Sequence, residues 1–236
     1  MDSAATHQLN RALLASAFGL GLLIASSTSV SACSLSLVLA MDVSASVDAT
    51  EHDLQLNGLA DALTDPSVMT AIGNVGGIWL TSFEWSGRYN QKTQLDWRFL
   101  VNEADIKAAA DVIAAQPRSQ TEFPTALGYA LGHASVLLTR APETCERNVI
   151  DMAGDGVTND GFGPSSAYKA FPLADVTVNG LVIGEDQNAI RYYHDEVIHG
   201  PGAFIEITDS FEGYRDAMIR KLLREIRGDQ FALNLP

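Results

Sequence analysis

The sequence contains little cysteine, little positive charge and no apolar run long enough to cross a bilayer. Only 2 of its 236 residues are cysteine, so no more than one disulfide can form within the chain. It has 15 Lys and Arg against 29 Asp and Glu, and the net charge of −14 disfavours nucleic acid and anionic membranes as partners. The same excess of carboxylates raises the local concentration of divalent cations.

The sequence also lacks the short motifs of several enzyme classes. It has no Gly-x-Ser-x-Gly elbow, phosphate-binding loop, dinucleotide fingerprint or zinc-protease helix. His194 and His199 do not have zinc-protease spacing, and we expect both at the surface. Hydrolase, nucleotide and redox chemistry therefore have no positive support in the sequence.

Residues 1–32 have the pattern of a secretory signal peptide. An apolar run at 12–24 follows Arg11, and a serine-rich stretch leads to small residues at Val30 and Ala32. The run is too short to span a bilayer, so we expect cleavage after Ala32 rather than a membrane anchor. The mature protein is then periplasmic or secreted, and residues 33–236 form one domain without an internal linker.

Cys33 and Cys145 each lie two residues before an apolar run, at 35–41 and 147–152. If these runs are neighbouring parallel strands, the cysteines lie level with each other and a disulfide fits. The competing interpretation is a lipoprotein, because Val-Ser-Ala-Cys also resembles a lipobox in which Cys33 is acylated. We favour the disulfide, since the apolar run ends well before Cys33 and lipidation would leave Cys145 unpaired in an exported protein.

Strand and helix patterns alternate along the mature chain. This alternation predicts a three-layer α/β sandwich, with a mostly parallel six-stranded central sheet, one antiparallel edge strand and helices on both faces. The expected strands are 35–41, 77–85, 93–100, 148–153, 176–183 and 203–208. The expected helices are 51–63, 102–115, 125–138 and 211–226.

An Asp42-x-Ser44-x-Ser46 motif follows the first expected strand. The strand is apolar throughout, which is typical of burial on both faces, and ligands bind at the carboxyl ends of such strands. One carboxylate and two hydroxyls suit Mg²⁺ better than zinc or copper. The alternative is that Ser44 and Ser46 cap the following helix.

Two further segments complete a resemblance to a known family. Thr125 begins the stretch Thr-Ala-Leu-Gly-Tyr-Ala-Leu, and Asp155-Gly156 follows the fourth expected strand. With Asp42-x-Ser44-x-Ser46 they resemble the metal-ion-dependent adhesion site (MIDAS) of the von Willebrand factor type A (VWA) domain. The resemblance covers residues 34–227. The stretches 84–89 and 200–204 are also similar to a narrower group of bacterial exported VWA-like proteins of unknown function.

This resemblance implies a Rossmann-like VWA fold and a ligand set. Ser44, Ser46 and Thr125 would bind Mg²⁺ through their hydroxyl oxygens, while Asp42 and Asp155 would hold it through waters. Mn²⁺ or Ca²⁺ are alternative ions. The implied function is an exported protein-binding or adhesion module without catalytic residues, whose protein partner supplies an Asp or Glu to the metal.

The sequence departs from the family pattern near Thr125. Phe123 and Pro124 stand where the family usually has Gly-Gly, so Thr121 is a weaker candidate for the same ligand. The turn after Asp155 is long, and Asn159 and Asp160 are candidates for further ligands or for hydrogen bonds to the ligands.

Two other functions compete with the binding module. The stretch 154–160 resembles the last acidic motif of haloacid dehalogenase-type phosphatases, in which Asp42 would be the nucleophile and Mg²⁺ would be held by Asp42, Asp155 and Asp160. Those enzymes need a second aspartate two residues after the nucleophile, where this chain has Ser44. The other alternative is a structural periplasmic protein with a vestigial metal site.

Overall fold

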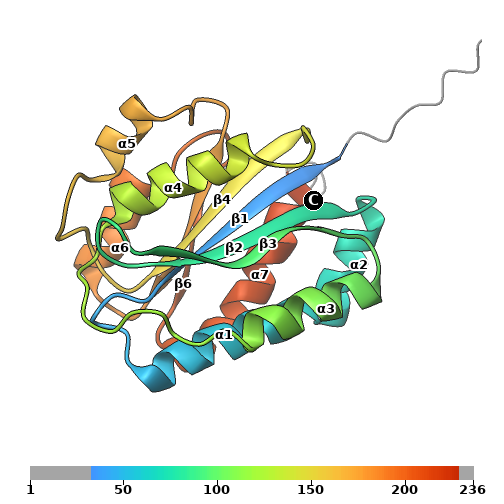
Figure 1. Cartoon of the computed structure of the whole chain (residues 1–236), viewed down its shortest axis with the longest axis horizontal. Coiled ribbons are helices and arrows are strands. Elements are labelled where there is room, and N and C mark those ends of the chain that lie inside the picture. Colours follow the sequence, from blue (N-terminus) through green and yellow to red (C-terminus); the bar gives the residue numbers. More distant parts are fainter. Residues whose placement is uncertain (1–32, 229–236) are drawn as a thin grey trace, which may run out of the picture. The chain divides into compact units, whose positions relative to one another are not determined.

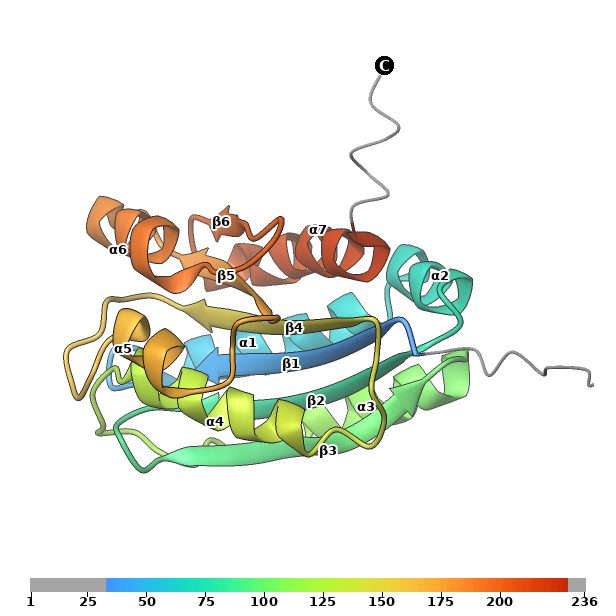
Figure 2. The same cartoon turned by 90° about the horizontal axis from the view of Figure 1, so that it is seen from above.

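The computed structural model describes residues 33–228, so the expected signal peptide lies outside the described residues. The sheet has the strand order β3-β2-β1-β4-β5-β6 (Figure 1, and Figure 2 with every strand labelled). All neighbouring strands are parallel except β2 and β3, which form an antiparallel hairpin at one edge. The strands are β1 (Leu35–Asp42), β2 (Ile78–Trp85), β3 (Gln91–Leu100), β4 (Arg147–Gly154), β5 (Thr177–Ile183) and β6 (Ile205–Thr208). The predicted fold class is confirmed.

Helices cover both faces of the sheet (Figure 1). One face carries α1 (Ala49–Leu63), α2 (Pro66–Asn74), α3 (Glu103–Ala114) and α7 (Tyr214–Arg227). The other carries α4 (Leu127–Thr139), α5 (Pro164–Ala170) and α6 (Gln187–Tyr192). A π-helical turn, η1 (Tyr193–Val197), continues α6, and the short 3₁₀ turn η2 (Phe211–Gly213) leads into α7. None of the helices within 33–228 has the length and apolarity needed to span a bilayer.

A hydrophobic core lies on each face of the sheet, and strand β1 contributes side chains to both. All eight of its residues are buried. Because side chains alternate along a strand, Leu37 and Leu39 pack toward α1 and α7, whereas Val38 and Ala40 pack toward α4. A strand covered on both faces reads as a continuous apolar run. Asp42 ends this run and is also fully buried.

Helix α1 begins at a capping box. The carboxylate of Asp48 accepts a hydrogen bond from the Glu51 backbone N–H, and the Glu51 carboxylate accepts one from the Asp48 backbone N–H. The interpretation that Ser44 and Ser46 cap this helix is therefore wrong. Their hydroxyls remain available at the end of β1.

The expected helix at 51–63 ends as predicted, but Asp65-Pro66 is more than a stop signal. Asp65 caps α2, and Pro66 occupies its first turn, where a missing N–H costs nothing. Helices α2, α5 and α6 are 9, 7 and 6 residues long and were not predicted. Such short segments show too little periodicity to be read from sequence.

The small residues of α4 serve two different contacts. Ala130 and Ala134 face the core beside the sheet, as expected. Gly128 and Gly132 instead face Phe162 and Phe171 from the connection after β4, and a Cβ on Gly128 would lie 2.1 Å from the Phe162 carbonyl oxygen. The helix is therefore held between the sheet and this connection.

The two cysteines form a disulfide, with their Cα atoms 4.4 Å apart. Leu35 pairs with Arg147 in the β1–β4 ladder, so the cysteines lie level at the amino ends of neighbouring strands, as predicted. The bond leaves no free thiol at Cys33 for a lipid. At the same edge, the Arg147 guanidinium donates to the carbonyl oxygens of Glu225 and Ile226 and holds the end of α7 beside the start of β4.

Candidate metal site

Three segments meet at the carboxyl edge of the sheet. Strand β1 ends at Asp42, and β4, its parallel neighbour, ends immediately before Asp155. Thr125 lies two residues before the first residue of α4. Because carboxyl ends of parallel strands share one edge, residues more than a hundred positions apart come together here.

Three hydroxyls and one carboxylate form a continuous polar chain at this edge. The Ser44 Oγ lies 3.1 Å from the Ser46 Oγ and 3.3 Å from the Thr125 Oγ1. The Ser46 Oγ donates to Asp155 Oδ1 over 2.9 Å. With Asp42, these residues are called the five-residue cluster below. All five expected ligands thus lie together.

Asp42 is the most deeply buried member of the five-residue cluster. Its Oδ1 accepts a hydrogen bond from the Ser44 backbone N–H at 2.7 Å, whereas its Oδ2 has no hydrogen-bond partner among the described residues. Burial raises the pKa of Asp42 to about 7, and the negative charge of Asp155 adds to the rise. Burial also raises the pKa of Asp155. A cation at this position would offset both charges.

Thr125 is held by the turn that follows β4. Its backbone N–H donates to the Asn159 side-chain oxygen at 2.9 Å, and its carbonyl accepts from the backbone N–H groups of Asn159 and Asp160. The Asp160 carboxylate pairs with Arg88 at 2.7 Å. Asn159 and Asp160 thus fix the backbone of Thr125, while Thr121 is exposed in the loop before it.

Phe123 and Pro124, where the sequence departs from the VWA pattern, precede Thr125, whose Oγ1 still lies 3.3 Å from the Ser44 Oγ. The Phe123 carbonyl accepts a hydrogen bond from the Ala45 backbone N–H at 2.9 Å, so this loop runs beside the one that carries Ser44. The Phe123 side chain is 40% exposed. The loop therefore carries an exposed aromatic ring next to the five-residue cluster.

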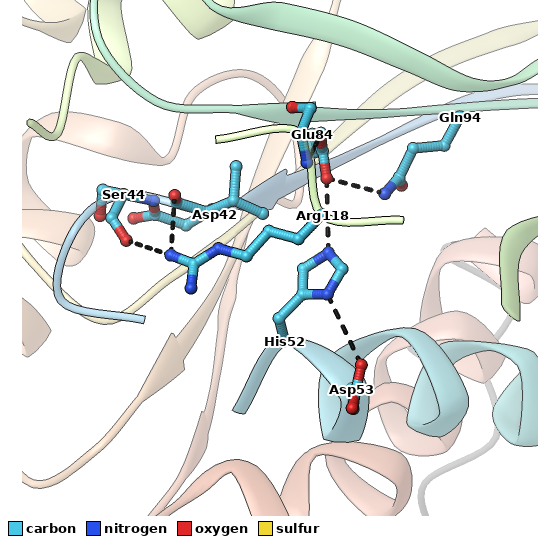
Figure 3. Close-up of polar contacts among 9 residues, drawn as sticks. Asp42, Ser44, His52, Asp53, Glu84, Gln94 and Arg118 are labelled. Carbon is cyan, nitrogen blue, oxygen red and sulfur yellow. Dashed lines mark hydrogen bonds and ion pairs between the residues drawn. The ribbon is translucent and has the colours of Figure 1, made fainter. Parts of the chain in front are cut away.

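A second set of polar side chains supports these loops and was not predicted from the sequence (Figure 3). The Arg118 guanidinium donates to the carbonyl oxygens of Val43 and Ser44, at 3.3 and 3.1 Å. The buried Glu84, at the end of β2, accepts from the Ser119 backbone N–H at 2.8 Å and contacts His52 on α1 at 3.4 Å. Nothing in the order of these residues in the chain links them to Ser44.

An open cavity of about 320 Å³ adjoins Asp155 on the β5 side of the five-residue cluster. Six carboxylate residues line it: Glu51, Asp155, Glu185, Asp186, Asp209 and Glu212. Negative charges gathered in a concave site attract cations and repel an acidic side chain.

The remaining metal-binding residue types lie elsewhere. His194 is exposed, as expected, and pairs with Asp195, whereas His199 is half-buried and its ring stacks on Tyr168. Between residues 33 and 228, no three His, Cys, Asp or Glu side chains are grouped so that they could hold a metal ion. The five-residue cluster is not such a group, because three of its members are hydroxyl residues and only two are carboxylates.

A family model and several solved structures resemble this chain. The model of the family described as "Protein of unknown function (DUF1194)" matches residues 32–230. No curated protein matches the chain. Proximal thread matrix protein 1 from the mussel byssus has a TM-score of 0.63 and 18% identity, covering 83% of this chain and 48% of that one. A form of that protein described as having a zinc-occupied MIDAS motif has a TM-score of 0.58 and 15% identity, with coverage of 82% and 48%.

Two bacterial structures share the same fold. The von Willebrand factor type A structure from Catenulispora acidiphila has a TM-score of 0.59 and 14% identity, covering 83% of this chain and 43% of that one. The pilus adhesin SpaC from Lactobacillus rhamnosus GG has a TM-score of 0.59 and 14% identity, with coverage of 83% and 31%. This chain therefore spans half or less of each of these relatives. At such identities the likeness shows the fold, which is VWA-like.

Proposed function

This chain belongs to the DUF1194 family and has a VWA-like fold, and we propose that it is an exported, Mg²⁺-dependent protein-binding module. The observation that carries the proposal is the convergence of Ser44, Ser46 and Thr125, whose hydroxyl oxygens form a chain with neighbours 3.1 and 3.3 Å apart. Hydroxyl and carboxylate oxygens are the ligands that Mg²⁺ prefers. No reaction step is assigned to the protein.

The residues present fit such an ion. Ser44, Ser46 and Thr125 would hold it through their hydroxyls, and Asp42 and Asp155 would lie behind them. Neutral ligands leave much of the charge of a divalent cation uncompensated, so an Asp or Glu side chain of a partner would be attracted to it. Mn²⁺ or Ca²⁺ would serve in the same way.

The charge around the site makes the metal necessary in this proposal. The adjoining cavity is lined by carboxylates and would repel an acidic partner residue. A bound Mg²⁺ offsets two of these negative charges and offers the partner's acidic side chain a ligand position, so partner binding should require the metal. A mussel thread matrix protein and a bacterial pilus adhesin share the fold, which supports a binding role over catalysis.

Export is the second part of the proposal. Residues 1–32 would be removed as a signal peptide, and residues 33–236 would be the mature single domain, in the periplasm or outside the cell. The Cys33–Cys145 disulfide supports this, because such bonds persist in oxidising compartments.

The phosphatase alternative gains no observation in its favour. It would place Asp160 on the metal, but the Asp160 carboxylate pairs with Arg88. The position that would need a catalytic aspartate is Ser44, whose hydroxyl belongs to the five-residue cluster. We therefore propose no enzymatic activity.

The proposal is tested by measuring metal binding and then partner capture. Isothermal titration with Mg²⁺ should show one site in the wild-type protein and none in Ser44→Ala or Thr125→Ala. Immobilised protein should then retain a partner from the native envelope fraction in Mg²⁺ and release it in EDTA. Equal capture in EDTA, or by the Thr125→Ala protein, would overturn the binding role. No Mg²⁺ binding by the wild type would leave the vestigial site as the better account.

A further inference from the structure

Tyr193 lies across the carboxyl edge of the sheet, beneath the five-residue cluster. It is the first residue of η1 and is fully buried in the core on the α4 face. Single π-helical turns are rare and occur often at functional sites, because they place one side chain where a regular helix would not. The residue has no motif around it that would single it out in the sequence.

Two glycines make room for the Tyr193 side chain. A Cβ on Gly180, in β5, would lie 2.7 Å from the Tyr193 ring. A Cβ on Gly154, the last residue of β4, would lie 2.6 Å from the Tyr193 hydroxyl oxygen. Both positions face the α4 side of the sheet, as do their neighbours Val182 and Met152. The ring therefore crosses β5, and its hydroxyl reaches the end of β4.

The Asp42 carboxylate also lies beside Gly154, on the side of β4 where β1 runs. The Cβ on Gly154 that would contact the Tyr193 hydroxyl would also lie 2.9 Å from Asp42 Oδ2. Asp42 Oδ1 is held by the Ser44 backbone N–H, but neither Asp42 Oδ2 nor the Tyr193 hydroxyl has a hydrogen-bond partner among residues 33–228. A buried acceptor and a buried donor without partners are each costly, and pairing them removes both costs.

We propose that Tyr193 is a positioning residue of the metal site, and that in the metal-bound protein its hydroxyl donates a hydrogen bond to Asp42 Oδ2. With Ser44 N–H on Oδ1, both oxygens of the Asp42 carboxylate are then held, and its plane is fixed toward the ion. Gly154 is required because any side chain there would separate the two groups. The inference rests on the proposed Mg²⁺ site and adds to it a residue that lies outside the motifs of the site.

The electrostatics of the site keep Tyr193 a donor. Burial raises its pKa well above the ordinary value, and the negative charges of Asp42 and Asp155 raise it further. The phenol therefore keeps its proton across the working pH range. A hydroxyl in this position stabilises the carboxylate without competing with it for the metal.

The chain contains a matched control. Tyr214, in α7, is also fully buried, and its hydroxyl also has no hydrogen-bond partner among the described residues, but it belongs to the core on the opposite face. Tyr193→Phe and Tyr214→Phe remove the same atom from comparable surroundings. Only the first should affect the metal.

The experiment measures the Mg²⁺ dissociation constant of wild type, Tyr193→Phe and Tyr214→Phe by isothermal titration. We expect about tenfold weaker binding for Tyr193→Phe, the lower end of what loss of a hydrogen bond to a metal ligand usually costs, and no change for Tyr214→Phe. A change of less than about twofold for Tyr193→Phe, or an equal loss in both variants, overturns the inference while the metal site itself stands. Absence of Mg²⁺ binding in the wild type overturns both.

A second measurement avoids any folding defect of the variants. Wild-type protein labelled with fluorotyrosine is titrated with Mg²⁺ and followed by fluorine NMR, with the two variants used only for assignment. The Tyr193 resonance should move on metal binding and stop moving in Asp42→Asn, while the Tyr214 resonance should stay fixed. A Tyr193 resonance that does not respond to Mg²⁺ contradicts the contact with Asp42.

Discussion

The carboxylate of Glu84 accepts a hydrogen bond from the backbone N–H of Ser119, with 2.8 Å between Oε1 and the nitrogen. Glu84 is 1% exposed, and its Oε2 also accepts from Gln94 and contacts His52. Burial alone would raise its pKa, but the hydrogen bonds from His52 and Ser119 outweigh burial and keep the pKa below its usual value. A charged, buried side chain thus holds the loop that leads to Thr125.

Removing this side chain should loosen the loop. We expect Glu84→Ala to lower the free energy of unfolding by about 1–3 kcal/mol, because the buried groups that it accepts from lose their partner. Mg²⁺ binding should weaken as well, since the ordering of Thr125 depends on the loop. Denaturant unfolding and isothermal titration measure the two effects, with Glu103→Ala on the exposed face of α3 as control. An equal effect of both substitutions would show that Glu84 has no special role.

The hydroxyl of Thr125 should be needed for metal binding, and that of Thr121 should not. Thr125→Ala removes an oxygen that lies 3.3 Å from the Ser44 Oγ, so we expect at least about tenfold weaker Mg²⁺ binding. Thr125→Ser keeps the oxygen and should retain most of the affinity. Thr121→Ala serves as the matched control in the same loop. Weaker Mg²⁺ binding in Thr121→Ala but not in Thr125→Ala would show that Thr121 supplies the ligand.

The stability of the metal-free protein should increase as the pH falls from about 8 to 5. Burial raises the folded-state pKa of Asp42 from 3.8 to about 7, so folding takes up a proton within this window. Above pH 7 the ionised Asp42 carboxylate destabilises the fold. Melting temperatures in EDTA across this range measure the effect.

Two changes should reduce this pH dependence. Mg²⁺ at pH 8 should restore stability, because the cation replaces the proton in offsetting the charge of Asp42. Asp42→Asn should reduce it as well, because the group that takes up the proton is removed. If the melting temperature in EDTA is flat, or rises with pH, then Asp42 is not buried as an uncompensated carboxyl group.

Lys221 should be important for the fold although it is not part of the five-residue cluster. Its ammonium group is fully buried and lies 2.9 Å from Asp151 Oδ1 and 2.5 Å from Glu225 Oε1. Lys221→Met leaves two buried carboxylates without a counter-charge, so we expect a loss of about 3–5 kcal/mol in the free energy of unfolding. Lys169→Met makes the same change on the exposed side of α5 and should cost little. Similar losses for both would contradict the buried ion pairs.

The disulfide should contribute to stability but not to metal binding. In the chain-entropy model, closing a loop of this length stabilises the fold by about 4–5 kcal/mol. We expect the double variant Cys33→Ser, Cys145→Ser to lose about that much in denaturant unfolding. Its Mg²⁺ affinity at low temperature should be unchanged, since the bond lies at the opposite ends of β1 and β4. The intact mass of the exported protein, two hydrogens below that of the reduced chain, verifies the bond, whereas a lipid adduct would contradict it.

The fold could be predicted largely because its strongest signals are local. The buried strand before Asp42, the antiparallel hairpin and the helix at 103–114 each show their own periodicity. The five-residue cluster was predicted from the rule that ligands bind at the carboxyl edge of a parallel sheet, together with the resemblance of three short motifs to the VWA metal site. The short helices α2 and α5 could not be read, because one or two turns produce no clear pattern.

The residues that support the site could not be predicted for a different reason. Arg118, Glu84 and Tyr193 act through contacts with backbone or carboxylate groups that are distant in the chain, and each residue type is common in loops and cores. Their roles depend on which loop runs beside which, as when Phe123 contacts Ala45. Such relationships follow from the folded chain and leave no spacing in the sequence.

The arrangement of the described chain ends bears on how the protein can be held. Cys33 lies at the start of β1, and Arg147 fixes the end of α7 beside the start of β4, so residues 33 and 228 both leave from the amino edge of the sheet. The five-residue cluster lies at the opposite edge. A bead, a sensor chip or a fused domain attached at residue 33 or 228 would therefore lie at the edge opposite the proposed metal site.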